Sequence, residues 1–63
     1  MKNHIKELRR TAKLSQEELA KLCKVSRQTI NAIENDKYDP TLQLAFNMAG
    51  VLNTTVDELF INK

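Results

Sequence analysis

Apolar residues recur three and four positions apart along most of this 63-residue chain, and that interval marks one face of an amphipathic helix. Together with the residues that typically begin and end helices, it predicts five helices. They span about residues 3–12, 15–23, 26–35, 41–52 and 55–60. With one glycine and one proline, the chain has few turns for an all-β fold. We therefore expect an all-α, five-helix fold that forms one domain over residues 1–63.

Hydroxyl residues mark the starts of three of these helices. Ser15 stands three positions before Glu18, which is the spacing of a capping box. In this motif the hydroxyl accepts from a first-turn amide, and the glutamate accepts from the N–H of the capping residue. Thr55 and Glu58 repeat the spacing, and Ser26 is a further N-cap. These signals define where the second, third and fifth helices begin.

The second and third helices are joined too tightly to lie side by side. Only Lys24 and Val25 stand before the Ser26 cap, so the two helices must cross steeply, as in a helix-turn-helix. Ala20 fits this arrangement because a small side chain allows close approach. After the third helix, residues 35–40 predict a loop, since Asn, Asp and Pro favour turns.

The third helix has two different faces. At about 100° per residue, Ile30, Ile33 and the methyl group of Thr29 fall on one side. The opposite side holds Arg27, Gln28, Asn31, Ala32 and Asn35. Arginine, glutamine and asparagine match the donor and acceptor patterns of base edges in the major groove. This face predicts a DNA-recognition helix over residues 26–35; an amide-rich helix that is merely exposed to solvent is the alternative.

Charge is distributed unevenly along the chain. The net charge is +2 overall, but residues 1–37 carry nine of the ten basic and five of the eight acidic residues, a net +4. The remainder has a net charge of −2. A basic half is expected where a surface meets phosphates. Ordinary solvated helix charge explains the same numbers equally well.

No pattern of residues points to catalysis or to a metal. The single cysteine, Cys23, cannot form an internal disulfide or a multi-cysteine zinc site, and its face predicts a small core residue. The single histidine, His4, has no second ligand at metal spacing and is expected to be solvated. We expect a cytoplasmic protein that is not an enzyme, with no cofactor, no small-molecule ligand and no membrane segment.

The chain resembles the lambda-repressor-like (XRE, Cro-type) family of regulators. The resemblance rests on SQEELA at 15–20, VSRQTINAIE at 25–34 and KYDP at 37–40. It implies a five-helix DNA-binding domain with a helix-turn-helix formed by the second and third helices. By position, it implies base contacts from Arg27, Gln28, Asn31 and Ala32. It implies phosphate contacts from Gln16, Asn35, Lys37, Tyr38, Arg10 and Lys13. Arg9 instead matches an arginine that pairs with the residue matching Glu34, so we expect a structural ion pair.

Three positions raise questions that the resemblance leaves open. Many relatives have glycine where Lys24 and Asp36 stand. If these backbones are left-handed, each costs on the order of 1 kcal/mol, and Lys24 brings a charge near the predicted DNA surface. Gly50 lies inside the fourth helix, where glycine costs roughly 0.8–1 kcal/mol relative to alanine. It either permits close approach at an interface or is simply tolerated.

One recognition helix reads only a few base pairs, so we expect a homodimer on a palindromic operator. Leu44, Val51, Phe60 and Ile61 are the candidates for an apolar dimer contact, and burial at the rim of the core is the alternative. The leading hypothesis is a repressor of transcription that binds double-stranded DNA. An antitoxin of a toxin-antitoxin module would use the same fold and is the main alternative. A protein-interaction domain would replace the polar face of the third helix by acidic or bulky apolar residues. Single-stranded RNA binding would need more exposed aromatic residues than we expect.

Overall fold

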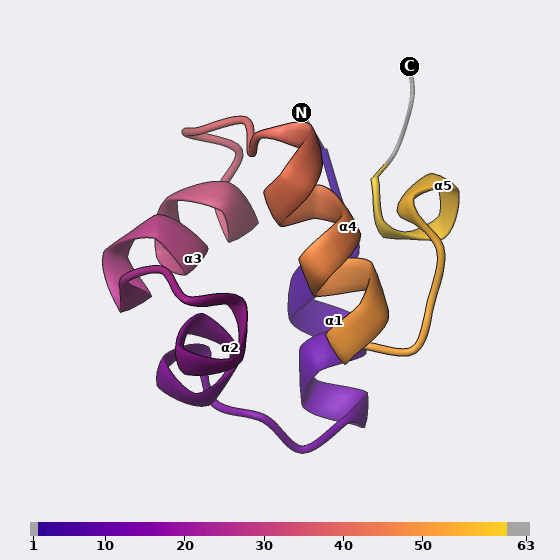
Figure 1. The fold of residues 1–63 in the computed structure, drawn as a ribbon, viewed down its shortest axis with the longest axis horizontal. Coiled ribbons are helices and arrows are strands. Elements are labelled where there is room, and N and C mark those ends of the chain that lie inside the picture. The colour runs from indigo at the N-terminus through magenta and orange to yellow at the C-terminus, as the bar shows by residue number, and fades with distance from the viewer. Residues whose placement is uncertain (1, 61–63) are drawn as a thin grey trace.

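The computed structural model describes residues 2–60, which form five helices (Figure 1). These are α1 (Ile5–Thr11), α2 (Gln16–Cys23), α3 (Arg27–Glu34), α4 (Leu42–Val51) and α5 (Val56–Leu59). The helix-turn-helix pair α2 and α3 occupies one side of the molecule, α1 and α4 cross its centre, and α5 covers the opposite side (Figure 1). The predicted fold class and all five helices are confirmed. Each observed helix is one to three residues shorter than expected, mainly because the expected ranges included the capping residues.

Side-chain caps define the starts of four helices. Ser15 accepts from the N–H of Glu18, and the Glu18 carboxylate accepts from the N–H of Ser15 at 2.8 Å, so the predicted capping box is present. Ser26 caps α3 by accepting from the N–H of Thr29. Thr41 caps α4 in the same way. Because each cap satisfies an otherwise orphaned N–H of the first turn, helix starts are encoded locally.

The expected capping box of α5 is only half formed. The Thr55 hydroxyl accepts from the N–H of Glu58, as expected. The Glu58 carboxylate, however, accepts from the hydroxyls of Thr54 and Thr55 at 3.2 and 3.3 Å. A neighbouring threonine hydroxyl thus competes with the backbone N–H for the carboxylate.

Left-handed residues end or follow four of the helices. Lys13, Lys24, Asp36 and Asn53 have φ between 55° and 61°. Lys24 is the C-cap of α2, and its N–H donates to backbone carbonyls of the last turn. The condition considered for Lys24 and Asp36 is therefore met, since both have a left-handed backbone. None of the four is glycine. Each connection therefore holds a residue with a side chain in the left-handed conformation, which is unfavourable for residues other than glycine.

The core is built from all five helices. Ile5, Leu19, Ile30, Ile33, Met48 and Leu59 are its largest fully buried side chains. α2 packs against both α3 and α4, and α4 packs against α5. Two apolar residues at helical spacing from core residues are not buried: Ala12 is exposed, and Leu42 is 69% exposed. Leu42 is the first residue of α4, where no neighbouring element reaches over it.

The amino-terminal segment connects α3 to the carboxyl-terminal segment. Asn3 forms an isolated antiparallel bridge with Phe60, and the His4 N–H donates to the carbonyl of Leu59 at 2.8 Å. The Asn3 side chain donates to the carbonyl of Ile33 at 2.8 Å, near the end of α3. One asparagine therefore contacts both Ile33, which is 30 residues away in the sequence, and Phe60, which is near the other end of the chain.

Candidate nucleic-acid interface

α3 divides sharply into a buried side and an exposed side. Ile30 and Ile33 are 0% and 1% exposed, and they anchor the helix to the core. Arg27, Gln28 and Asn31 are exposed on the other side. The orientation predicted for this helix is confirmed. Since apolar burial stabilises by roughly 25 cal/mol per Å², two fully buried isoleucines give the helix a fixed rotation about its axis.

Arg27 and Gln28 have side chains that are available for an external partner. Within residues 2–60, neither side chain makes a hydrogen bond or an ion pair to another residue. Both lie in the first turn of α3, the end that enters the groove in a helix-turn-helix. Gln28 also lines a shallow hollow with Thr29, Ala32, Lys37 and Tyr38. Residues predicted to contact bases thus adjoin residues predicted to contact phosphates.

Asn31 and Asn35 form a pair instead of standing free. The Asn35 side-chain nitrogen donates to the Asn31 carbonyl at 2.9 Å and to Asn31 Oδ1 at 3.3 Å. Both residues are exposed, and Asn35 is the C-cap of α3. The helical spacing of four positions brings the two side chains together.

Gln16 is engaged within the protein. Its Nε2 donates to Glu34 Oε1 at 3.0 Å. The same carboxylate accepts from Arg9 Nε at 2.7 Å and from Arg9 Nη2 at 3.3 Å. Arg9 also donates to the carbonyl of Leu14 at 2.8 Å. The structural pair expected between Arg9 and Glu34 is confirmed, and Gln16 extends it into a network that joins α1, α2 and α3.

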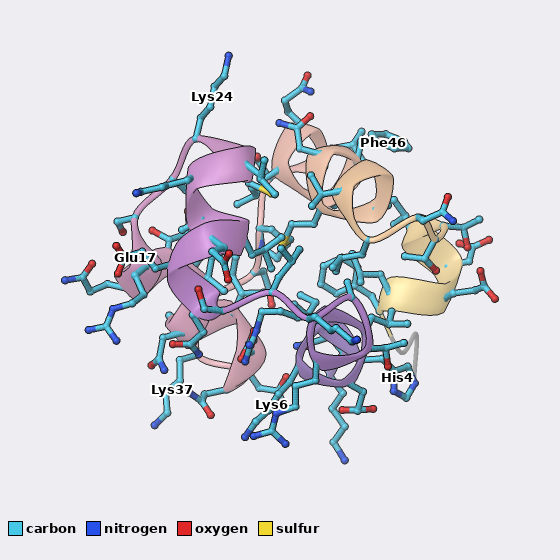
Figure 2. All side chains as sticks on the ribbon, turned by 90° about the horizontal axis from the view of Figure 1, so that it is seen from below. His4, Lys6, Glu17, Lys24, Lys37 and Phe46 are labelled. Carbon is cyan, nitrogen blue, oxygen red and sulfur yellow. The ribbon has the colours of Figure 1, made fainter. Side chains whose placement is uncertain are left out.

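Lys6 and Lys37 lie toward one side of the molecule, and Lys24 lies on the other (Figure 2). Lys37 extends outward beside α3, and Lys6 lies on the same lower side of the view (Figure 2). Phe46 extends from α4 on the opposite side, and Lys24 also extends upward, away from Lys37 (Figure 2). Lys24 is therefore remote from the loop that carries Lys37. Tyr38, next to Lys37, is 50% exposed.

The two remaining phosphate candidates flank the end of α1. Arg10 and Lys13 are both exposed. Lys13 has φ 61°, so its position depends on a left-handed backbone at the helix end. Arg10 stands in the last turn of α1, where a cation also interacts favourably with the helix dipole. Neither residue belongs to the α3 surface itself.

Two residues judged non-functional have ordinary structural roles. Cys23 is 4% exposed, and burial raises the pKa of its thiol, which keeps it protonated. It packs as a small core residue. His4 is exposed and lies 2.9 Å from a carboxylate oxygen of Glu7. An exposed pair of this kind contributes little to stability.

The candidates for a dimer contact differ in how much surface they leave. Leu44 and Phe60 are both 8% exposed because they pack in the core of their own chain, so little of either side chain remains for a partner. Val51 is half-buried against the core. Ile61 lies outside the described residues.

Two exposed apolar residues of α4 were missed by the sequence analysis. Leu42 and Phe46 are 69% and 57% exposed, and they stand one helical turn apart. Tyr38 and Phe46 also contradict the expectation that the aromatic residues are mostly enclosed. The absence of any charged residue from α4 (sequence LQLAFNMAGV) is the signal that could have pointed to this surface, because solvated helix faces normally carry charge.

These features define a helical DNA-binding protein of the helix-turn-helix class. Residues 5–59 match the helix-turn-helix family model HTH_3. The chain belongs to this family, whose members bind DNA and are not enzymes. None of the helices formed by residues 2–60 has the length and apolarity needed to cross a bilayer.

Several relatives are described as HTH-type transcriptional regulators. One from Methanocaldococcus jannaschii is 51% identical over 97% of this chain and 92% of its own length. Another from Archaeoglobus fulgidus is 44% identical over 97% of this chain and 86% of its own length. A Bacillus subtilis relative, YgzD, is 40% identical over 95% and 91% of the two chains. The chain is accordingly a DNA-binding regulator of transcription.

The fold also resembles that of a solved regulator. The clp gene regulator ClgR from Corynebacterium glutamicum superposes with a TM-score of 0.79 at 19% sequence identity. The likeness covers 82% of this chain and 55% of that one. At this level of identity the comparison supports the arrangement of the helices alone.

Proposed function

We propose that the protein represses transcription by binding a palindromic operator as a homodimer, with residues 26–35 in the major groove. The observation that carries this proposal is the division of α3 into buried Ile30 and Ile33 and exposed, unpaired Arg27 and Gln28. Arginine binds guanine O6 and N7, and glutamine binds adenine N6 and N7. Ala32 is half-buried in the hollow beside Gln28 and offers a small surface to a thymine methyl group.

Phosphate contacts on both sides of α3 would hold the helix in the groove. Lys37 and Tyr38 supply one side, and Arg10 and Lys13 are the candidates nearer α1. Gln16 begins α2, where backbone N–H groups point outward and favour an anion. One N–H of the Gln16 side-chain amide donates to Glu34. Gln16 would therefore bind a phosphate through its backbone N–H and through the second N–H of its side-chain amide.

The base-reading assignment is tested by comparing base and phosphate variants on the same DNA. A half-site selected from a random duplex pool serves as the specific probe, and scrambled duplex is the control. Arg27→Ala and Gln28→Ala are each expected to cost about 1–3 kcal/mol on the specific probe and to relax preference at particular base pairs. Lys37→Ala should weaken both probes alike and reduce the salt slope by about one. If Arg27→Ala binds both probes as the unchanged protein does, the assignment is wrong.

Repression is tested with a reporter whose promoter contains the selected site. Occupancy of the promoter DNA by the bound protein is the mode of action that we propose. Expression of the protein should lower reporter output, and Arg27→Ala should restore it. Higher output with the unchanged protein would identify an activator instead.

We place the dimer contact at Leu42 and Phe46, the two exposed apolar side chains of α4. A groove beside Leu42 would receive the partner's apolar side chains; its lining is Asp39, Pro40, Ala45, Val56, Asp57 and Phe60. Val51 and Ile61 remain proposed contributors, whereas Leu44 and Phe60 would support the contact from beneath. In a two-fold contact the same patch meets itself, which suits α4 because none of its own residues is charged.

Sedimentation equilibrium tests this surface. The double variant Leu42→Glu, Phe46→Glu should be monomeric and should lose operator affinity. Leu22→Glu is the matched control, because Leu22 is also 57% exposed but lies on α2. A second double variant, Val51→Glu with Ile61→Glu, tests the other two contributors. If the α4 double variant sediments as the control does, the contact lies elsewhere.

A further inference from the structure

The Asn35 side chain, predicted to contact a phosphate, is engaged within α3 in the free protein. Its Nδ2 donates to the Asn31 carbonyl at 2.9 Å and to Asn31 Oδ1 at 3.3 Å. The carbonyl of Asn31 also accepts the N–H of Asn35 at 3.1 Å. Two donors from the C-cap residue therefore converge on one exposed asparagine of α3.

This pairing decides which way the Asn31 amide faces. Its oxygen is directed toward Asn35, one turn further along α3, so its Nδ2, on the other side of Cγ in the same plane, is directed away from Asn35. Among the described residues, no group accepts a hydrogen bond from Asn31 Nδ2. Asn31 thus presents two N–H donors outward, and an acceptor is the complementary group.

We propose that Asn35 is a positioning residue for base recognition, and that it makes Asn31 read its base mainly through its N–H donors, with a preference for guanine. The inference rests on the proposed function, in which α3 enters the major groove. A free asparagine reads adenine by donating to N7 and accepting from N6. With the oxygen held by Asn35, the donors of Asn31 match the adjacent acceptors N7 and O6 of guanine instead.

Variants of Asn35 should change which base is selected. In Asn35→Ala, the Asn31 amide is free to turn, and preference at its base pair should move from guanine toward adenine. Asn35→Asp has nearly the same shape but accepts where asparagine donates, so it should turn the Asn31 oxygen outward. Its preference should move to bases that present a donor, adenine or cytosine. A single good base contact discriminates by about five-fold or more, so the loss at this position is measurable.

The experiment is selection from a random duplex pool by the unchanged protein and by Asn35→Ala, Asn35→Asp, Asn31→Ala and Asn47→Ala. Asn47 is the matched control, because its Oδ1 accepts from Gln43 Nε2 at 3.1 Å in an equivalent pair on α4. The expected result is that Asn35 and Asn31 variants change the selected base at the same position, whereas Asn47→Ala selects the original site. Thermal melting of each variant establishes that it is folded.

Three outcomes would count against the proposal in distinguishable ways. Uniformly weaker binding by Asn35→Ala, with an unchanged selected site and a salt slope lower by about one, makes Asn35 a phosphate ligand and overturns it. Selection of adenine by the unchanged protein at the position that Asn31→Ala relaxes also overturns it. If the unchanged protein selects no sequence, the proposed function fails, and this inference fails with it.

Discussion

Replacing Glu34 by alanine removes the acceptor that Arg9 and Gln16 share. The Glu34 side chain is 2% exposed and that of Arg9 is 10% exposed, so the pair is shielded from water. Three hydrogen bonds end on this carboxylate, at 2.7, 3.0 and 3.3 Å. Without it, the carbonyl of Leu14 is the one hydrogen-bond partner that the Arg9 guanidinium keeps among residues 2–60. Leaving a buried charge in this way typically costs about 3–5 kcal/mol.

That cost is large beside the stability of so small a domain. At about 0.05–0.15 kcal/mol per residue, 63 residues correspond to roughly 3–9 kcal/mol. We therefore expect Glu34→Ala to be substantially unfolded at room temperature. Arg9→Met should have a similar effect, because it leaves the buried Glu34 carboxylate without its positively charged partner. The double variant Arg9→Met, Glu34→Leu removes both charges and should recover at least half of the loss, since apolar replacement of a whole buried pair is often close to neutral.

Urea denaturation followed by circular dichroism measures all three variants, at one protein concentration so that assembly is held constant. The control is Glu7→Ala, which breaks the exposed contact between His4 and Glu7 at 2.9 Å. It should change the free energy of unfolding by less than about 0.5 kcal/mol. If Glu34→Ala destabilises no more than Glu7→Ala, or if the double variant loses the sum of both single losses, the account of this network is wrong.

Three further predictions concern stability. A Cβ at Gly50 would meet nothing within 4 Å, so Gly50→Ala should raise the free energy of unfolding by roughly 0.8–1 kcal/mol; a lower melting temperature would instead place Gly50 at a close contact between chains. Lys24→Gly should relieve the strain of φ 59° and raise stability by up to about 1 kcal/mol, and an unchanged denaturation midpoint would contradict this. Hydrogen bonds from the backbone and side chain of Ser15 hold the pKa of Glu18 below its ordinary value of 4.5. Because the folded-state pKa is the lower one, this stabilisation is present above pH 4.5 and is lost as the pH falls through the folded value; Glu18→Gln should flatten the acid side of the stability curve, and an identical acid profile would rule out the linkage.

The features that the sequence predicted are those encoded by near neighbours. Ser15 and Ser26 cap α2 and α3 because their partners lie within one turn, and the same local geometry places Ile30 and Ile33 on one face. The short link at Lys24 and Val25 requires the steep crossing of α2 and α3. Each of these depends on spacing alone, so the fold and the orientation of α3 followed from the residues.

The features that escaped prediction depend on contacts between distant segments or on the exact direction of a side chain. Gln16 matches a phosphate-binding position, yet its amide reaches Glu34, which is 18 residues away. Asn35 turns back onto Asn31, and no spacing rule says which end of an amide faces its neighbour. Leu42 has the right interval for the inward stripe of α4, but it stands beyond the reach of any covering element. Helical periodicity shows which residues share a face, but it does not show which part of that face is covered by neighbouring elements.

The brevity of the five helices has a consequence for how the domain melts. They contain 7, 8, 8, 10 and 4 residues, all below the roughly 12–15 residues at which an isolated helix becomes even marginally stable in water. Capping residues thus choose the starting points, but only mutual packing keeps the helices formed. Once the apolar core is exposed to water, none of the five helices is stable on its own. Heating should therefore abolish helical ellipticity and side-chain order in one cooperative transition, with no residual helical intermediate.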